Sequence, residues 1–236
     1  MSTSNVMVIT GTSRGIGRGM AEFFATHGWT VIGCSRGEST LGDLSGYHHS
    51  RVDVSDEKQV RDWARGVKRE HGRVDALVCN VGLVERGALT GVTTLESFQA
   101  FVNSILTTTF LVCREYSKLM GLQRYGRIVN LTSIMTELHA PGTPAYASAK
   151  AAVVEFTKVL AREVANQGIT CNVVSPSLVS TEASMAFGDQ WKANMLAMQT
   201  LQRPIDVAEL CNIVQFFTAP QSGCVTGQVL HTCLVN

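Results

Sequence analysis

The sequence predicts an α/β protein with one doubly wound domain built on a seven-stranded parallel sheet. Short apolar runs alternate along the chain with segments of helical periodicity, which is the pattern of strand–helix–strand units. The first run, residues 6–9, is apolar at every position, as expected of a strand buried on both faces of a parallel sheet. A glycine-rich turn follows it directly. No linker, repeat or low-complexity tract interrupts the alternation, so we expect residues 1–236 to form a single domain.

The first strand–helix–strand unit fills about the first 35 residues. After the strand at residues 6–9, the apolar residues Ile16, Met20 and Phe23 fall at helical spacing, and Gly28 ends this helix. Residues 30–34 form the second strand. The later strands are predicted at residues 48–52, 76–79, 127–131, 169–174 and 228–233. The later helices are predicted at residues 56–70, 94–120, 145–166 and 206–218, the first of them capped by Ser55.

The composition excludes several classes of protein. Apolar residues make up 45% of the 236 residues and the net charge is +1, so we expect neither a disordered chain nor a nucleic-acid or membrane partner. No apolar run approaches the roughly 18 residues that span a bilayer. The first five residues lack the features of a signal peptide. The seven dispersed cysteines contain no Cys-x-x-Cys pair, and the histidines have no zinc spacing, so we expect reduced thiols, no metal and a cytoplasmic location.

The glycine loop, residues 10–17, lies between the first strand and the first helix. Its glycines are spaced Gly-x3-Gly-x-Gly, which differs from the usual Gly-x-Gly-x-x-Gly fingerprint. Glycines here let the backbone approach a pyrophosphate, and the N-terminus of the helix attracts the anion. The alternative is an ordinary glycine-bearing turn. The residues expected to bind the cofactor are Gly11, Thr12, Ser13, Arg14, Gly15, Ile16 and Gly17.

The end of the second strand indicates which dinucleotide is bound. An NAD site places an acidic residue here to hold the ribose diol, but this chain has Ser35 and Arg36. An arginine pairs with a 2′-phosphate, and Arg14 can approach the same group. The sequence therefore favours NADP over NAD, the alternative being that Arg36 is solvated surface.

Two further turns follow strands at the carboxyl edge of the sheet, where ligands bind in such folds. The first is Asp53-Val54, whose carboxylate would accept a hydrogen bond from an adenine amino group. The second is Asn80-Val81-Gly82, whose glycine lets the chain pass close to a ribose. Ordinary turns are the alternative for both.

Tyr146 and Lys150 lie four residues apart in a predicted helix and so share one face. An ammonium group near a phenol favours the phenolate and would make the phenol more acidic. Such a phenol exchanges protons with a substrate near neutral pH. By itself the spacing is common in helices, and it gains meaning only beside the other motifs.

Together these residues resemble the classical short-chain dehydrogenase/reductase family over the whole chain. The resemblance rests on the glycine loop, Asp53-Val54, Asn80–Gly82, Ser133, and Tyr146 with Lys150. Within the family, residues 168–176 and 226–230 are most similar to 3-oxoacyl-acyl-carrier-protein reductases. The resemblance implies a Rossmann fold and hydride transfer between a nicotinamide and a carbonyl or alcohol.

The resemblance also implies roles for individual residues. Ser133 would hydrogen-bond the substrate oxygen, Tyr146 would donate its proton to that oxygen, and Lys150 would lower the pKa of the tyrosine and hold the nicotinamide ribose. Val179 and Thr181 would contact the nicotinamide carboxamide.

Several positions depart from the family pattern. The usual asparagine of the central helix falls on Ile105, and Asn103 lies about 200° around the helix from it. Ser177 stands where the family has a glycine, so we expect a restricted backbone beside the nicotinamide. The segment around residues 203–206 is short, and the C-terminus lacks the customary Gly-Gly. Family tetramers commonly pack their last strands there, so assembly can differ.

Two further features of the sequence indicate what kind of substrate the protein binds. Arg124 matches one arginine that grips an acidic carrier protein in these reductases, whereas the other position is Gln167. Residues 182–202, which we call the lid segment, contain apolar residues that favour an apolar substrate: Met185, Phe187, Trp191, Met195, Leu196 and Met198. Ordinary helix packing explains these residues equally well.

The sequence thus predicts NADPH-dependent reduction of a ketone, either a 3-oxoacyl thioester or a related carbonyl of a specialised pathway. An oxidative alcohol dehydrogenase of the same family and a non-catalytic NADP-binding subunit are the alternatives. We expect a homodimer or homotetramer, because the two long helices at residues 94–120 and 145–166 resemble the dimer-forming pair of the family.

Overall fold

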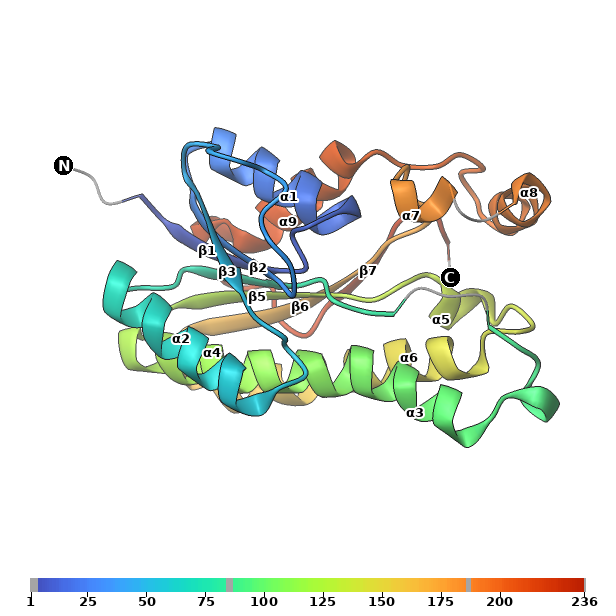
Figure 1. Cartoon of the computed structure of the whole chain (residues 1–236), viewed down its shortest axis with the longest axis horizontal. Coiled ribbons are helices and arrows are strands. Elements are labelled where there is room, and N and C mark those ends of the chain that lie inside the picture. The colour runs from blue at the N-terminus through green and yellow to red at the C-terminus, as the bar shows by residue number, and fades with distance from the viewer. Residues whose placement is uncertain (1–3, 84–86, 186–187, 236) are drawn as a thin grey trace.

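The computed structural model describes residues 4–83, 87–185 and 188–235. Their seven strands lie in the order β3-β2-β1-β4-β5-β6-β7, and every neighbouring pair is parallel (Figure 1). This confirms the predicted doubly wound, seven-stranded sheet. The strands are β1 (Val6–Thr10), β2 (Thr30–Ser35), β3 (Tyr47–Arg51), β4 (Ala76–Cys79), β5 (Gly126–Leu131), β6 (Ile169–Ser175) and β7 (Val229–His231).

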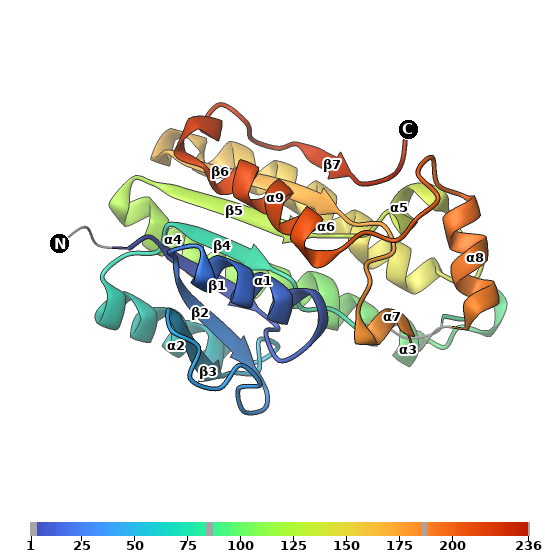
Figure 2. The same cartoon turned by 90° about the horizontal axis from the view of Figure 1, so that it is seen from above.

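Helices cover both faces of this sheet (Figures 1 and 2). The helices α1 (Gly15–Thr26) and α9 (Val207–Thr218) pack on one face, around Phe24 and Phe217. The helices α2 (Glu57–His71), α4 (Thr108–Gln123) and α6 (Pro144–Val164) pack on the other. Because both faces are covered, the central strands β1, β4, β5 and β6 are buried at every position, which is why they are mostly apolar in the sequence.

The remaining elements are short. They are α3 (Leu95–Val102), α5 (Met135–Leu138), α7 (Glu182–Met185) and α8 (Asp189–Ala197), the π-helical turn η2 (Asn103–Thr107), and the 3₁₀ turns η1 (Thr90–Val92), η3 (Ala165–Gln167) and η4 (Pro220–Ser222). Within the described ranges, no helix has the length and apolar character needed to cross a bilayer.

Two local predictions need correction. Asp56, not Ser55, caps α2: its carboxylate accepts from the Gln59 N–H at 3.0 Å, while the Ser55 hydroxyl donates to Asp53 at 2.7 Å. The helix predicted over residues 94–120 is interrupted by η2. There the hydroxyls of Thr108 and Thr109 donate to the carbonyl groups of Ser104 and Ile105, at 2.8 and 2.7 Å, and such back-bonding bends helices.

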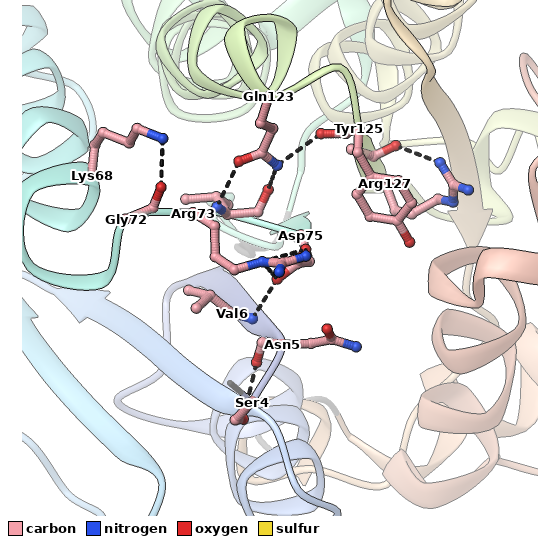
Figure 3. A network of polar contacts seen from close by, with 12 residues as sticks. Ser4, Asn5, Val6, Lys68, Gly72, Arg73, Asp75, Gln123, Tyr125 and Arg127 are labelled. Carbon is pink, nitrogen blue, oxygen red and sulfur yellow. Dashed lines mark hydrogen bonds and ion pairs between the residues drawn. The ribbon is translucent and has the colours of Figure 1, made fainter. Parts of the chain in front are cut away.

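A polar network ties the amino edge of the sheet together (Figure 3). The carboxylate of Asp75, just before β4, accepts from the Val6 N–H of β1 at 2.7 Å and pairs with the Arg73 guanidinium. The Gln123 side chain at the end of α4 bonds the backbone of Val74 and Tyr125. These contacts anchor the strands at one edge, while the opposite, carboxyl edge carries the predicted site.

Candidate active site

The carboxyl edge of the sheet brings together the motifs that are far apart in the sequence. The glycine loop leaves β1, Ser35 ends β2, and Asn80 follows β4. Ser133 follows β5 and Ser177 follows β6. Because the strands are parallel, all five segments emerge on the same side, as the sequence predicts.

The glycine loop is shaped for close packing against the turn after β4. Gly11 has φ +75°, and a Cβ on Gly17 would lie 2.2 Å from the Gly11 oxygen, so a side chain at residue 17 would not fit. The Asn80 amide donates to the carbonyl groups of Thr10 and Gly11, at 3.1 and 3.3 Å, and holds the loop in place. Asn80 therefore supports the loop directly.

The start of α1 is suited to an anion. Arg14 occupies the N-cap position, and its side chain does not cap the helix. The N–H groups of the first turn, at Gly15, Ile16 and Gly17, thus have no side-chain acceptor. Free N–H groups and the helix dipole together form an anion site of the kind that a pyrophosphate needs. Thr181 lies across from this loop, with its Cβ 3.9 Å from the position of a Cβ on Gly15.

Arg36 in the turn after β2 and Arg14 in the glycine loop are both suited to a phosphate. In the described part of the chain, neither Arg14 nor Arg36 makes a side-chain hydrogen bond or ion pair, whereas Arg51 pairs with Glu38 at 3.5 Å. The Thr40 hydroxyl donates to the Ser13 carbonyl at 2.8 Å and links this turn to the glycine loop. Unpaired guanidinium groups near a loop of N–H donors fit a phosphate-bearing ligand.

Asp53 and Val54 contribute differently from each other. One oxygen of the Asp53 carboxylate accepts from the N–H and the hydroxyl of Ser55, at 2.9 and 2.7 Å, which leaves the second oxygen for a ligand. The Val54 side chain is buried in the core, so only its backbone is available at the edge. Val81 is half-buried and its N–H donates to Thr10 at 3.3 Å.

Ser133, Tyr146 and Lys150 meet above β5. The Lys150 amine is buried, donates to the Leu131 carbonyl at 2.9 Å and lies 5.9 Å from the centroid of the Tyr146 ring. A Cβ on Gly82 would lie 3.5 Å from this amine, so the turn after β4 passes beside it. Phe101 of α3 packs edge-on against the Tyr146 ring, with the centroids 6.2 Å apart.

The protonation of this trio differs from the sequence prediction. Burial raises the pKa of the Tyr146 phenol, and a hydrogen bond with Ser133 lowers it by less. Burial also lowers the pKa of Lys150 to about 8. The sequence predicts a phenol made more acidic by the amine; in the structure, burial of the phenol sets the direction of its pKa shift instead. The phenol therefore keeps its proton at neutral pH.

The family asparagine position is apolar here, as the sequence indicates. Ile105 is 1% exposed and its Cγ1 lies 3.3 Å from the position of a Cβ on Gly82. Asn103 is exposed, and its side chain contacts Thr107 on the same turn. The Ser104 hydroxyl, which the sequence does not single out, accepts from the Leu83 N–H at 3.3 Å and ties η2 to the turn after β4.

Ser177, which stands where the family has a glycine, lies in unstrained backbone. It is absent from the described residues with positive φ. Its N–H donates to the Thr232 hydroxyl at 2.7 Å and its own hydroxyl donates to Gln199 at 2.9 Å. Sequence reasoning missed Gln199, whose only signal was its place in the lid segment.

The lid segment packs over the trio. Trp191 and Met195 of α8 form an apolar cluster with Met135 and Tyr146, and Met198 is 42% exposed. Val179 is buried and pairs with Ile205 in a parallel bridge below the segment. Phe187 and the Met185 side chain lie outside the described residues.

Arg124 lies at the other edge of the sheet, just before β5. Its guanidinium donates to the Asn166 carbonyl at 2.8 Å, and Gln167 follows that residue. Arg124 is thus separated from the Tyr146 of its own chain by the full length of β5.

Comparison with known proteins agrees with this geometry. The family described as enoyl-(acyl carrier protein) reductase matches residues 11–233. The 3-oxoacyl-(acyl-carrier-protein) reductase FabG of Escherichia coli (strain K12) is 32% identical over 231 residues, which cover 96% of this chain and 94% of that protein. The FabG of Vibrio harveyi is also 32% identical, with the same coverage.

Solved structures give the same result. The structure of ElxO with NADP bound has a TM-score of 0.90 and 26% identity, covering 97% of this chain and 96% of that chain. A structure of actinorhodin polyketide ketoreductase with NADPH has a TM-score of 0.89 and 29% identity, covering 98% and 96%.

Proposed function

Since the chain belongs to the short-chain dehydrogenase/reductase family of oxidoreductases, we propose that it reduces a ketone to an alcohol with NADPH. The meeting of Ser133, Tyr146 and Lys150 at the carboxyl edge, with a phenol that keeps its proton, carries this proposal. A protonated phenol is the state that reduction needs, because the carbonyl oxygen gains a proton as it becomes a hydroxyl. The reductase relatives and the NADP-bound neighbours support it.

The residues of the chain bind and orient the reactants. The N–H groups at the start of α1 would bind the pyrophosphate, and Ser35, Arg36 and Arg14 the 2′-phosphate. Asp53 would accept from the adenine, the turn 80–82 would lie along the ribose, and Val179 and Thr181 would face the carboxamide. NADPH, when bound, supplies the hydride.

At the substrate, two hydroxyl groups act on one oxygen. Ser133 would donate a hydrogen bond to the carbonyl oxygen and stabilise the charge that develops there. Tyr146 would then transfer its proton to the same oxygen. Lys150, held by the Leu131 carbonyl, is mostly charged at pH 7 with a pKa of about 8, and its charge would stabilise the phenolate that remains.

We propose a 3-oxoacyl thioester or a related ketone as substrate. The relatives named above are 3-oxoacyl-(acyl-carrier-protein) reductases, and the apolar cluster of Met135, Met195 and Trp191 beside Tyr146 suits an apolar chain. Arg124 lies far from the Tyr146 of its own chain. A carrier protein bound at Arg124 would therefore deliver the substrate to the active site of another copy of the chain.

We also propose a homodimer or homotetramer acting in the cytoplasm. Phe110 on α4 and Val159 on α6 are large apolar side chains, 41% and 55% exposed, that a second copy would cover. All seven cysteines are free thiols, as in a reducing compartment.

The test is NADPH oxidation with an acetoacetyl thioester, a quinone-type ketone and an enoyl thioester. We expect turnover with a ketone, and a loss of about 10²–10⁴-fold in Tyr146→Phe with unchanged NADPH binding. Tyr125→Phe, at the amino edge, is the matched control. Turnover of the enoyl thioester alone would replace the proposed reaction, and NADPH binding without any turnover would favour a non-catalytic subunit. Faster alcohol oxidation with NAD would favour the dehydrogenase alternative.

A further inference from the structure

Gly33, in the centre of β2, leaves space in which the hydroxyl groups of Tyr47 and Thr12 contact each other. A Cβ on Gly33 would lie 2.4 Å from the Tyr47 hydroxyl oxygen and 2.5 Å from the Thr12 oxygen. Any side chain at residue 33 would therefore displace one of them. Tyr47, from β3, reaches across the missing side chain and contacts the Thr12 hydroxyl at 2.7 Å. The glycine thus makes room for a contact between β3 and the glycine loop.

From Tyr47 the chain of hydrogen bonds continues to the turn after β2. The Tyr47 hydroxyl lies 2.8 Å from His49 Nδ1. The other ring nitrogen, His49 Nε2, lies 2.9 Å from the Gly37 carbonyl oxygen and 3.3 Å from the Ser35 hydroxyl. His49 therefore contacts the residues on both sides of Arg36.

The partners fix the direction of these hydrogen bonds. A carbonyl oxygen only accepts, so His49 Nε2 carries a hydrogen and donates it to Gly37. In the neutral ring Nδ1 is then an acceptor, and the Tyr47 hydroxyl donates to it. Burial raises the pKa of Tyr47, so this hydroxyl keeps its proton. The Thr12 hydroxyl then donates to Tyr47 at 2.7 Å in preference to the Cys34 carbonyl, which lies at the longer distance of 3.4 Å. Each polar side-chain atom of Thr12, Tyr47 and His49 thus has a hydrogen-bond partner, which favours a single orientation of the His49 ring.

The series of hydrogen bonds from Thr12 through Tyr47 to His49 ends at the turn that carries Ser35 and Arg36. Besides His49, Arg51 Nε donates to the Arg36 carbonyl at 3.0 Å, and the Ser35 hydroxyl donates to the Gly37 carbonyl at 3.0 Å. The backbone of the turn is thus fixed from β3, while the Arg36 side chain stays exposed. The fit of this turn to a phosphate rests on the exposed Arg36 guanidinium.

We propose that His49, held by Tyr47 and Thr12, is a positioning residue that sets the preference for a dinucleotide with a 2′-phosphate. This inference rests on the proposed function, in which Ser35 and Arg36 bind that phosphate. His49 bonds Gly37 and Ser35 and so holds the backbone on both sides of Arg36, from which the exposed Arg36 side chain would reach the 2′-phosphate. A dinucleotide without the phosphate makes no use of that arrangement.

The test measures dissociation constants of NADPH and NADH by fluorescence titration, with no substrate present. In His49→Ala we expect the dissociation constant of NADPH to rise about tenfold, because the hydrogen bonds that position Arg36 are lost. The dissociation constant of NADH should change less than about twofold. Tyr47→Phe keeps the ring but removes the hydroxyl that donates to Nδ1 and accepts from Thr12, so we expect about a threefold loss for NADPH alone. His49→Gln keeps an N–H donor and should restore most of the preference. His48→Ala is the matched control, because this exposed imidazole lies on the opposite face of β3.

The outcomes separate this inference from the proposed function. Wild-type protein that binds both dinucleotides equally would overturn the cofactor assignment and the role of His49 together. If the wild type prefers NADPH and Arg36→Ala abolishes the preference, but His49→Ala and Tyr47→Phe retain it, only the present inference fails. Equal losses for both dinucleotides, with a lowered melting temperature, would also overturn it, since they show general damage to the fold.

Discussion

Replacing Ser177 with alanine tests how firmly the lid segment is attached to the sheet. The Ser177 hydroxyl donates to Gln199 Oε1 at 2.9 Å, and the two residues are 8% and 4% exposed. Gln199 Nε2 donates in turn to the Met195 carbonyl at the end of α8. The side chains of α8 that contact Tyr146 are thus joined to the end of β6 through one buried amide.

The expected cost follows from what the substitution leaves behind. In Ser177→Ala the Gln199 oxygen stays buried without a donor, and such an orphan costs about 1–3 kcal/mol. For a chain of this size, each kcal/mol lowers the melting temperature by about 2–4 °C. Changing Gln199→Met as well removes the orphan, so the double variant should lose at least about 1 kcal/mol less than the sum of the single variants.

The assay combines chemical denaturation of all three variants with hydrogen exchange of residues 189–199. We expect Ser177→Ala to speed exchange of the amides in α8 and to raise KM more than it lowers kcat. Ser180→Ala, at an exposed serine three residues on, should change neither quantity. Additive losses within about 0.5 kcal/mol, or unchanged exchange in α8, would refute the attachment.

Three other perturbations have expected outcomes. The pKa of Lys150 in the folded protein, about 8, lies below its ordinary value of 10.5, so the buried charge lowers stability fully below pH 8 and progressively less up to pH 10.5. Over this range the free energy of unfolding of the wild type, measured in urea, should rise on the order of 3 kcal/mol relative to that of Lys150→Met. Arg36→Ala should weaken NADPH binding about tenfold or more and NADH hardly at all, and equal losses in the two titrations would contradict its assignment. Asp75→Ala should cost about 2–4 kcal/mol in the same unfolding assay, because it leaves the Val6 N–H and Arg73 without their acceptor; activity per folded molecule should stay unchanged, and a selective loss of kcat would argue against its purely structural place.

The strands were predictable because each one carries its own signal. A strand covered on both faces is mostly apolar, although β5 and β6 also bury polar residues such as Asn130 and Asn172, and this pattern is local in the sequence. The cap of α2 was not predictable in the same way, because Ser55 and Asp56 are both good caps. The structure decides between them through Asp53, which takes up the Ser55 hydroxyl. The π-helical turn at residues 103–107 likewise depends on which carbonyl groups the threonine hydroxyls bind.

The parts of the site that belong to a short motif could be predicted from the sequence. The parts that depend on contacts between residues far apart in the chain could not. The glycine loop and the Tyr146–Lys150 pair are recognised within a few residues of sequence. Tyr47 and Thr12 are 35 residues apart, and Ser177 and Gln199 are 22 apart. Such pairs have no local periodicity or spacing, so nothing in the sequence joined them. The sequence indicates only a missing glycine at Ser177, whereas its hydroxyl makes a new contact with Gln199.

The protonation of Tyr146 shows why spacing alone does not give the chemistry of a pair. Two groups four residues apart on a helix attract each other, but burial acts on both and opposes the charged form of each. Ile105 and Phe101 enclose this region with apolar side chains, and the result is a phenol with a raised pKa beside an amine with a lowered one. A phenol in this state gives up a proton only when an acceptor of developing negative charge is within reach. Reduction of a carbonyl creates that acceptor, whereas oxidation of an alcohol requires the phenolate at the outset, which burial disfavours. The raised pKa of Tyr146 is thus compatible with the reductive direction of the proposed reaction.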